Sequence, residues 1–154
     1  MRPPKIPVSV LVLIHSADGQ VLLLQRADRP DYWQSVTGSL DAVDEDPLLA
    51  ARRELQEETG FLPEDGRLWS LDIRNRYEIY PHWRHRYAPG VTHNTEHVFA
   101  YALPEVREPR LAPREHLSFE WLPWAEAAAR CFSPNNAEML RVLARREGWP
   151  GAAR

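Results

Sequence analysis

Three glutamates within a span of five residues are the feature of this chain that most clearly points to chemistry. Glu54, Glu57 and Glu58 lie in a segment whose apolar residues recur at helical spacing, and Gly60 follows as a stop signal. On a helix, residues three and four apart share one side, so the three carboxylates are expected to be neighbours. Two unit charges ~4 Å apart repel by about 1 kcal/mol in water and by roughly 4 kcal/mol at an effective dielectric of 20. Oxygen ligands gathered in this way favour a hard divalent cation, Mg²⁺ or alternatively Mn²⁺.

A solvated acidic helix face is the plainer interpretation of these glutamates, and the surrounding sequence argues against it. The segment from Arg53 to Phe61, with Glu45 placed seven residues ahead of it, resembles the Nudix box. That motif holds a glycine, a glutamate and the pattern Arg-Glu-apolar-x-Glu-Glu-x-Gly-apolar at fixed spacing. One departure is visible, because six residues, and not five, separate Gly38 from Glu45. The resemblance implies an enzyme that hydrolyses phosphoric anhydrides with a divalent metal.

The same resemblance implies a role for each acidic residue. Glu54 and Glu58 are expected to bind Mg²⁺, with Glu57 as a third carboxylate of the motif. Glu115, which lies outside the motif, matches a further metal ligand, although alone it is typical of a charged strand end. Either Glu54 or Glu57 is the candidate base for the attacking water, and Arg53 is expected to orient a carboxylate through an ion pair.

Loop segments outside the motif restrict the resemblance to one group of enzymes within the Nudix superfamily. Residues 31–39, 84–92, 94–96 and 115–117 are similar to segments of the bacterial pyrophosphatases that act on dihydroneopterin triphosphate in folate biosynthesis. This implies products of dihydroneopterin monophosphate and pyrophosphate. A departure falls at residues 131–135, where a Ser-Trp-Ser-Asn-like run is expected instead. The residues expected to bind substrate are Lys5, Arg26, Thr37, Tyr77, Glu78, Ile79, Tyr80, Arg84 and Arg86.

Two of these substrate residues lie in a stretch from His82 to Glu96 that mixes cations, histidines and aromatic residues without a helical or strand period. A mobile surface turn is one interpretation of the stretch. Beside a carboxylate helix, Arg84 and Arg86 are instead expected to bind phosphate oxygens through their forked guanidinium groups. Arg26, at the end of an expected strand, is either a solvated charge or a further phosphate ligand.

The elements that must position these residues predict an α/β fold. A helix is expected after Pro47, and Asn135 or Asn136 is expected to cap the last helix. The tail from Gly148 onward is expected to be frayed. A mixed sheet between helices follows, which is the Nudix-type α/β/α sandwich, as a single domain over residues 1–154. Strands are expected over 8–14, 20–26, 33–39, 68–73, 77–80, 97–103 and 115–122, with a further short helix over 123–130.

Composition restricts the partners. The net charge of −3 offers no broad basic field for nucleic acid, and no apolar run approaches the ~20 residues that a membrane helix needs. The single cysteine, Cys131, and an N-terminus unlike a signal peptide predict a cytoplasmic protein. The resemblance implies a small-molecule triphosphate as the partner, and the oligomeric state is not predicted. Two other functions stay open: a hydrolase of nucleoside triphosphates or dinucleoside polyphosphates, and a nucleotide-binding module without catalysis.

Overall fold

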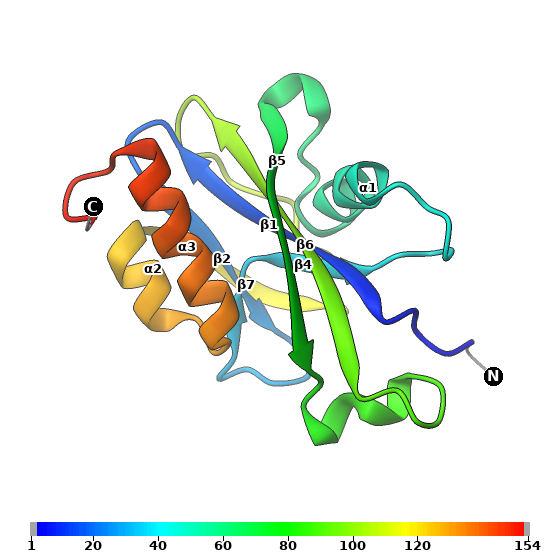
Figure 1. The fold of residues 1–154 in the computed structure, drawn as a ribbon. Helices are drawn as coiled ribbons and strands as arrows, with labels where there is room; N and C mark the ends of the chain where they lie inside the picture. The colour runs from blue at the N-terminus through cyan, green and yellow to red at the C-terminus, as the bar shows by residue number, and fades with distance from the viewer. Residues whose placement is uncertain (1–2, 153–154) are drawn as a thin grey trace.

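A mixed seven-stranded sheet organises the chain in this computed structural model, which describes residues 3–152 (Figure 1). The strands follow the order β3-β2-β1-β6-β5, while β4 pairs with β1 and β7 pairs with β2. Only the pairing of β1 with β6 is parallel. The strands are β1 Val8–Ser16, β2 Gln20–Arg26, β3 Trp33–Gln34, β4 Val36–Ser39, β5 Arg67–Glu78, β6 His93–Leu103 and β7 His116–Pro123.

Strand β1 lies at the centre of the sheet, and one of its edges is shared. It pairs with β6 along its whole length on one side. On the other side it pairs with β4 from Ser9 to Val12 and with β2 at His15. This division makes β2 and β4 diverge, and it carries β4 toward the helix that follows it.

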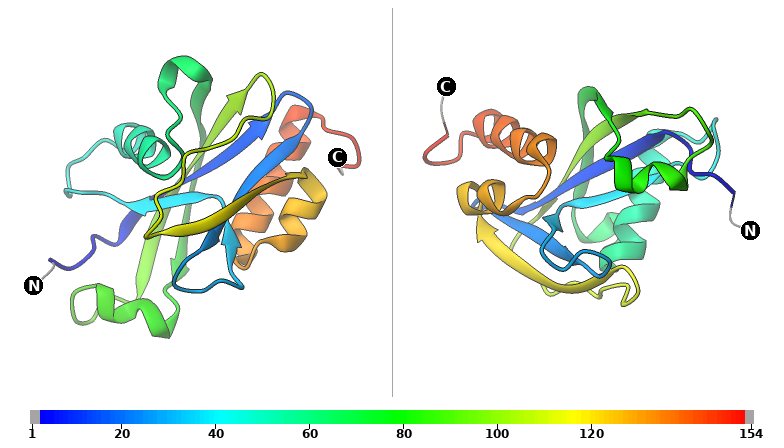
Figure 2. Two further views of the ribbon diagram at one scale, coloured as in Figure 1. Left: turned by 180° about the vertical axis from the view of Figure 1, so that it is seen from behind. Right: turned by 90° about the horizontal axis from the view of Figure 1, so that it is seen from below.

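Helices cover both faces of the sheet. Alternate residues of a strand point to opposite faces, so Val10 and Val12 pack beneath α1, with Leu55, while Leu11 and Leu13 pack beneath α3, with Leu140. Figures 1 and 2 show α1 on one face and α2 and α3 together on the other. The predicted α/β/α sandwich is confirmed. The helices are α1 Pro47–Thr59, α2 Trp124–Arg130 and α3 Pro134–Glu147, and the 3₁₀ turns are η1 Pro63–Asp65 and η2 Pro81–Arg86.

Three strand predictions were wrong. The short strand and glycine turn expected over 33–39 form two strands, because β3 pairs with β2 while β4, which includes Gly38, pairs with β1. The two strands expected over 68–73 and 77–80 are one strand, β5, which stays paired with β6 past a register shift between Ser70 and Ile73. Asp72, inside this bulge, has a positive φ of 57°. Strand β6 also begins at His93, four residues before the expected start, because it continues to pair with both β1 and β5 there. Pairing with neighbouring strands overrides the polar sequence in the middle of β5 and at the start of β6.

The C-terminal predictions need correction as well. Neither expected asparagine caps α3: the cap is Ser133, whose hydroxyl accepts a hydrogen bond from the Asn136 amide at 3.3 Å. The expected frayed tail contains Trp149, which is buried against His15 with ring centroids 4.8 Å apart. Residues 153–154 lie outside the described part of the chain. Among residues 3–152, no helix is long and apolar enough to cross a membrane.

Candidate active site

Helix α1 turns one glutamate into the protein interior. Asp46 caps its first turn by accepting a hydrogen bond from the Leu48 amide at 3.0 Å, and Gly60 ends it with φ 76°. Leu55 is fully buried against the sheet. Glu58 is three residues further along the helix and therefore points to the same side.

The carboxylate of Glu58 is buried without a compensating partner. Its residue is 1% exposed, and neither carboxyl oxygen has a hydrogen-bond partner among the described residues. The nearest basic group is the His116 ring, with Nε2 3.6 Å from Oε1 of Glu58. Burial raises the pKa of Glu58 well above its ordinary value, and the nearby carboxyl of Glu54 raises it further. A buried charge of this kind is tolerated when it binds a metal or a counter-ion.

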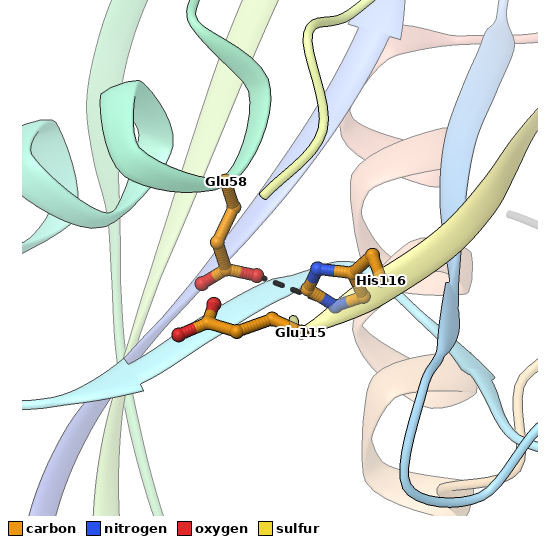
Figure 3. Close-up of side chains that lie close together, drawn as sticks. All are labelled: Glu58, Glu115 and His116. Atoms are coloured by element: carbon orange, nitrogen blue, oxygen red, sulfur yellow. Dashed lines mark ion pairs between the residues drawn. The ribbon is translucent and has the colours of Figure 1, made fainter. Parts of the chain in front are cut away.

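A set of metal-ligating groups gathers around this carboxylate (Figure 3). Glu58 reaches in from α1, and Glu115 and His116 approach from the start of β7. One ligand atom from each of these three residues lies within 4.8 Å of the others. Two carboxylates, one of which is an orphaned buried group, fit a divalent cation.

His116 was missed by the sequence reasoning. Burial lowers the pKa of its imidazole to about 4, and its Nδ1 has no hydrogen-bond partner among residues 3–152. Its position directly after Glu115 was the available signal, but a single histidine beside a glutamate has no recognised metal-binding spacing.

Gly38 of β4 makes room for the second glutamate of the helix. A Cβ added to Gly38 would lie 2.1 Å from Cδ of Glu54, so any other residue would displace the carboxylate. Burial raises the pKa of Glu54, and the negative charge of Glu57 adds to this effect. The close approach of strand and helix therefore accounts for the glycine of the motif, despite the extra loop residue that follows it.

Arg53 ties the loop before α1 to the carboxylates on the helix. Its Nη1 lies 2.7 Å from Oε1 of Glu54 and 3.7 Å from Oε2 of Glu57. Its Nη2 lies 3.1 Å from Oε1 of Glu45 and donates a hydrogen bond to the Ser39 carbonyl at 3.3 Å. This geometry suits an orienting role for Arg53, while Glu57 stays largely exposed.

Two of the expected substrate arginines meet at a residue that the sequence reasoning did not identify. Asp28 accepts a forked pair of hydrogen bonds from Arg26 at 2.8 and 2.9 Å, and Nη2 of Arg86 lies 3.2 Å from the same carboxylate. The hydrogen bond from Arg26 holds the pKa of Asp28 at about 2. The Arg26 guanidinium also lies 4.5 Å from the ring centroid of Trp83. These contacts fix the two cations in one place.

Lys5 joins this group from the N-terminal segment. Its amide donates a hydrogen bond to the Arg86 carbonyl at 2.8 Å. Desolvation lowers the pKa of its ammonium group, with further lowering from Arg86 and Arg26, whereas Glu54 and Glu115 oppose the shift. The charges of both the arginines and the acidic cluster therefore act on the pKa of the Lys5 ammonium group.

The remaining expected substrate residues are spread over the end of β5 and the turn after it. Arg84 donates to the Ile79 carbonyl at 3.0 Å and lies 3.5 Å from the Glu78 carboxylate, so it holds the strand end and does not join Arg86 at Asp28. Ile79 is buried and Tyr80 is exposed.

Thr37 and Tyr77 are placed on the sheet itself. Thr37 donates from its hydroxyl to the Val10 carbonyl at 3.0 Å, and Tyr77 accepts a hydrogen bond from Asn94 at 3.0 Å. Both residues lie on the face covered by α3. Thr37 pairs with Leu11, which belongs to the core beneath α3. Tyr77 is two residues beyond Asn75 on β5, so it shares the face of Asn75 and of its cross-strand partner Glu96.

The sandwich fold, the buried glutamate on α1 and the nearby fixed cations define a hydrolase of phosphoric anhydrides that uses a divalent metal. The NUDIX domain model matches residues 5–143 of the chain. The chain belongs to the Nudix family.

Two relatives of this chain, both from bacteria, match it over most of its length. The chain is 45% identical over 139 residues to dihydroneopterin triphosphate diphosphatase of Escherichia coli K12, which covers 88% of this chain and 91% of the relative. It is 41% identical over 136 residues to the Haemophilus influenzae protein of the same name, covering 86% of this chain and 84% of the relative. The structure of the E. coli dihydroneopterin triphosphate pyrophosphohydrolase superimposes with a TM-score of 0.88 at 42% identity, covering 94% of this chain and 99% of that chain.

Proposed function

We propose that this protein is a Mg²⁺-dependent pyrophosphohydrolase that converts dihydroneopterin triphosphate into dihydroneopterin monophosphate and pyrophosphate. The observation that carries the proposal is the buried carboxylate of Glu58, which has no hydrogen-bond partner among residues 3–152 and lies close enough to Arg26 for that charge to lower its pKa. The two bacterial relatives act on this substrate by name, and they match this chain over most of its length.

Metal binding is assigned to the carboxylates of the acidic cluster. Glu54, Glu57, Glu58 and Glu115 are the proposed ligands, and His116 lies close enough to Glu58 to join them. When bound, Mg²⁺ neutralises the triphosphate and activates the attacking water. Mn²⁺ is expected to substitute, because it also accepts oxygen ligands.

Protein groups supply the remaining steps. Glu54 or Glu57 takes the proton of the attacking water, and Arg53 holds Glu54 in place through the 2.7 Å ion pair. Arg26 and Arg86, which are already held at Asp28, donate to phosphate oxygens, and Lys5 adds a further positive charge. These cations balance the charge of a polyphosphate that must approach an acidic helix.

A substrate panel tests this function. Purified protein is incubated with Mg²⁺ and dihydroneopterin triphosphate, dATP or diadenosine tetraphosphate, and the products are separated and identified. The expected result is the fastest turnover on dihydroneopterin triphosphate, with release of pyrophosphate. Equal or faster turnover of a nucleotide would assign the substrate to the nucleotide class, and tight binding without any hydrolysis would make the protein a binding module.

A further inference from the structure

A second buried carboxylate lies on the opposite face of the sheet from Glu58. Glu96 of β6 is 4% exposed, and it faces the α3 layer because it alternates with Val98 in the core beneath that helix. Oε1 of Glu96 accepts a hydrogen bond from Nδ2 of Asn135 at 2.7 Å, and the Tyr77 hydroxyl lies 3.5 Å from Oε2. The proposed reaction makes no use of this carboxylate.

The hydrogen bonds that Glu96 receives leave acceptor sites of its carboxylate unused. A carboxylate has about four acceptor sites, and among residues 3–152 this one accepts two hydrogen bonds, a short one from Asn135 and a long one from Tyr77. Burial raises the pKa of Glu96 to about 7, although the Tyr77 and Asn135 hydrogen bonds act in the opposite direction. A ligand that donates hydrogen bonds would supply what the carboxylate lacks.

Two polar side-chain atoms beside Glu96 are buried without a hydrogen-bond partner among residues 3–152. Asn94 lies two residues earlier on the same face and donates to Ser9 at 2.7 Å and to Tyr77 at 3.0 Å, yet its Oδ1 is buried without a partner among residues 3–152. Asn75 pairs with Glu96 across the strands, and its Nδ2 is likewise buried without a hydrogen-bond partner among these residues. Each such group costs about 1–3 kcal/mol, so a polar cluster of this kind is expensive as a purely structural core.

The polar cluster is connected to the phosphate-binding cations. Tyr87 is bridged to Lys5 through the backbone. Burial raises the pKa of the Tyr87 hydroxyl, and the charges of Arg86 and Glu96 both act on it, so this side chain lies between the two regions. Tyr87 therefore connects the segment that carries Lys5 and Arg86 to the polar cluster around Glu96.

Aromatic rings flank the same region. Phe132 lies three residues before Asn135 and stacks on Tyr32 with ring centroids 4.2 Å apart and planes within 3°. Trp83, which holds Arg26, approaches Phe132 edge-on with centroids 5.9 Å apart. Such surfaces suit a flat heterocycle.

We infer that Glu96, assisted by Asn135, binds the 2-amino-4-oxopyrimidine edge of the substrate ring. This edge presents two adjacent donors, the N3–H and the exocyclic amino group, and a carboxylate accepts both. Nδ2 of Asn135 donates one N–H to Glu96, and its second N–H would donate to the neighbouring ring carbonyl. Adenine presents an acceptor nitrogen at the corresponding place, which would face the carboxylate without a proton. The inference rests on the proposed function, since it identifies the part of that substrate that this carboxylate selects.

The variant Glu96→Gln tests this selection, because the amide keeps the shape and loses one acceptor. Dihydroneopterin triphosphate and dGTP share the edge, and dATP lacks it. The kcat/KM is expected to fall roughly 10–100-fold for the first two, the range for a lost hydrogen bond to a charged group, and to change less than about threefold for dATP. Glu120→Gln, on exposed β7 beside Arg130, is the matched control and is expected to leave all three values unchanged.

Binding without turnover separates ring recognition from phosphate recognition. Neopterin, which carries no phosphate, is titrated in the absence of metal and followed by its fluorescence, and pyrophosphate with Mn²⁺ is titrated by calorimetry. Glu96→Gln is expected to weaken neopterin binding at least tenfold and to leave pyrophosphate binding unchanged. If the substitution lowers the melting temperature severely, Asn135→Ala, at a half-buried position, gives the same comparison with Glu96 in place.

The outcomes for the two proposals can be told apart. If the unsubstituted protein does not hydrolyse dihydroneopterin triphosphate, the proposed function is wrong. If it does hydrolyse it, and Glu96→Gln lowers the kcat/KM of all three substrates by the same factor or leaves neopterin binding intact, the assignment of Glu96 is overturned and the proposed function stands.

Discussion

Replacement of Glu58 by Gln is expected to make the metal-free protein more stable and the enzyme much less active. The carboxylate is 1% exposed and has no hydrogen-bond partner among the described residues. An amide of the same shape removes the charge that burial makes unfavourable. Stability and activity should therefore change in opposite directions at one position.

The size of the stability gain depends on pH. Because the pKa of Glu58 is raised in the folded protein, its ionisation does not lower the stability of the fold at pH values below the unfolded-state pKa of about 4.5. As the pH rises above that value, the folded state must keep a proton that the unfolded state releases, and stability falls. The variant lacks this titration, so its advantage should grow from pH 5 to pH 8.5. An unpaired buried polar group costs about 1–3 kcal/mol and an unpaired buried charge costs more, so the Gln amide keeps the smaller cost and removes the excess. Each kcal/mol gained corresponds to roughly 2–4 °C in melting temperature for a domain of this size.

The assay is thermal unfolding in EDTA and in Mg²⁺ or Mn²⁺. Metal at 100 times its dissociation constant should stabilise the unsubstituted protein by about 2.7 kcal/mol, and the variant should lose most of this gain. Its kcat should fall roughly 10²-fold or more. Glu57→Gln, at a side chain that is 55% exposed, should stay within about 0.5 kcal/mol of the parent in EDTA. A less stable Glu58→Gln protein in EDTA, or one that keeps the full metal-induced shift, would refute the reasoning.

Three further substitutions have expected outcomes that differ in kind. Arg53→Lys cannot pair with Glu45 and Glu54 at once, as the guanidinium does through Nη2 at 3.1 Å and Nη1 at 2.7 Å, so kcat should fall at least tenfold with a melting temperature near that of the parent; an unchanged kcat would remove the orienting role. Gly38→Ala would force the Glu54 carboxylate from its place, and kcat should fall about 10²-fold while circular dichroism stays unchanged. Asn136→Ala removes two hydrogen bonds to Ser35, at 2.9 and 3.0 Å, and chemical denaturation should show a loss of about 2–4 kcal/mol with the substrate preference retained.

The sequence was sufficient for the elements whose signals are local. Asp46, Pro47 and Gly60 set the ends of α1 through capping and backbone preference, and these act within one turn of the helix. The apolar run over 8–14 likewise predicted the strand β1, which is buried on both faces. The β5 prediction failed because Arg74 to Arg76 is polar, and only pairing with β6 keeps that segment extended.

The parts of the site that the sequence did not reveal depend on contacts between distant segments. Asp28 has no motif around it, and its importance appears only when Arg86, 58 residues away, reaches its carboxylate. His116 lies beside Glu58 because β7 pairs with β2, which no local pattern specifies. Glu96 was part of a matched segment, but nothing in the sequence shows that it is buried.

The sheet divides the site between its two faces, and β4 contributes to both. Gly38 opens space for Glu54 on the α1 face, while its neighbour Thr37 points to the α3 face, where Glu96 also lies. The proposed metal ligands and the proposed ring-binding groups are therefore carried by different layers. Residues beneath α3 can change without disturbing the glutamates of α1, which is a physical reason why the glutamate motif predicts the class of reaction and only the loop segments indicate the substrate.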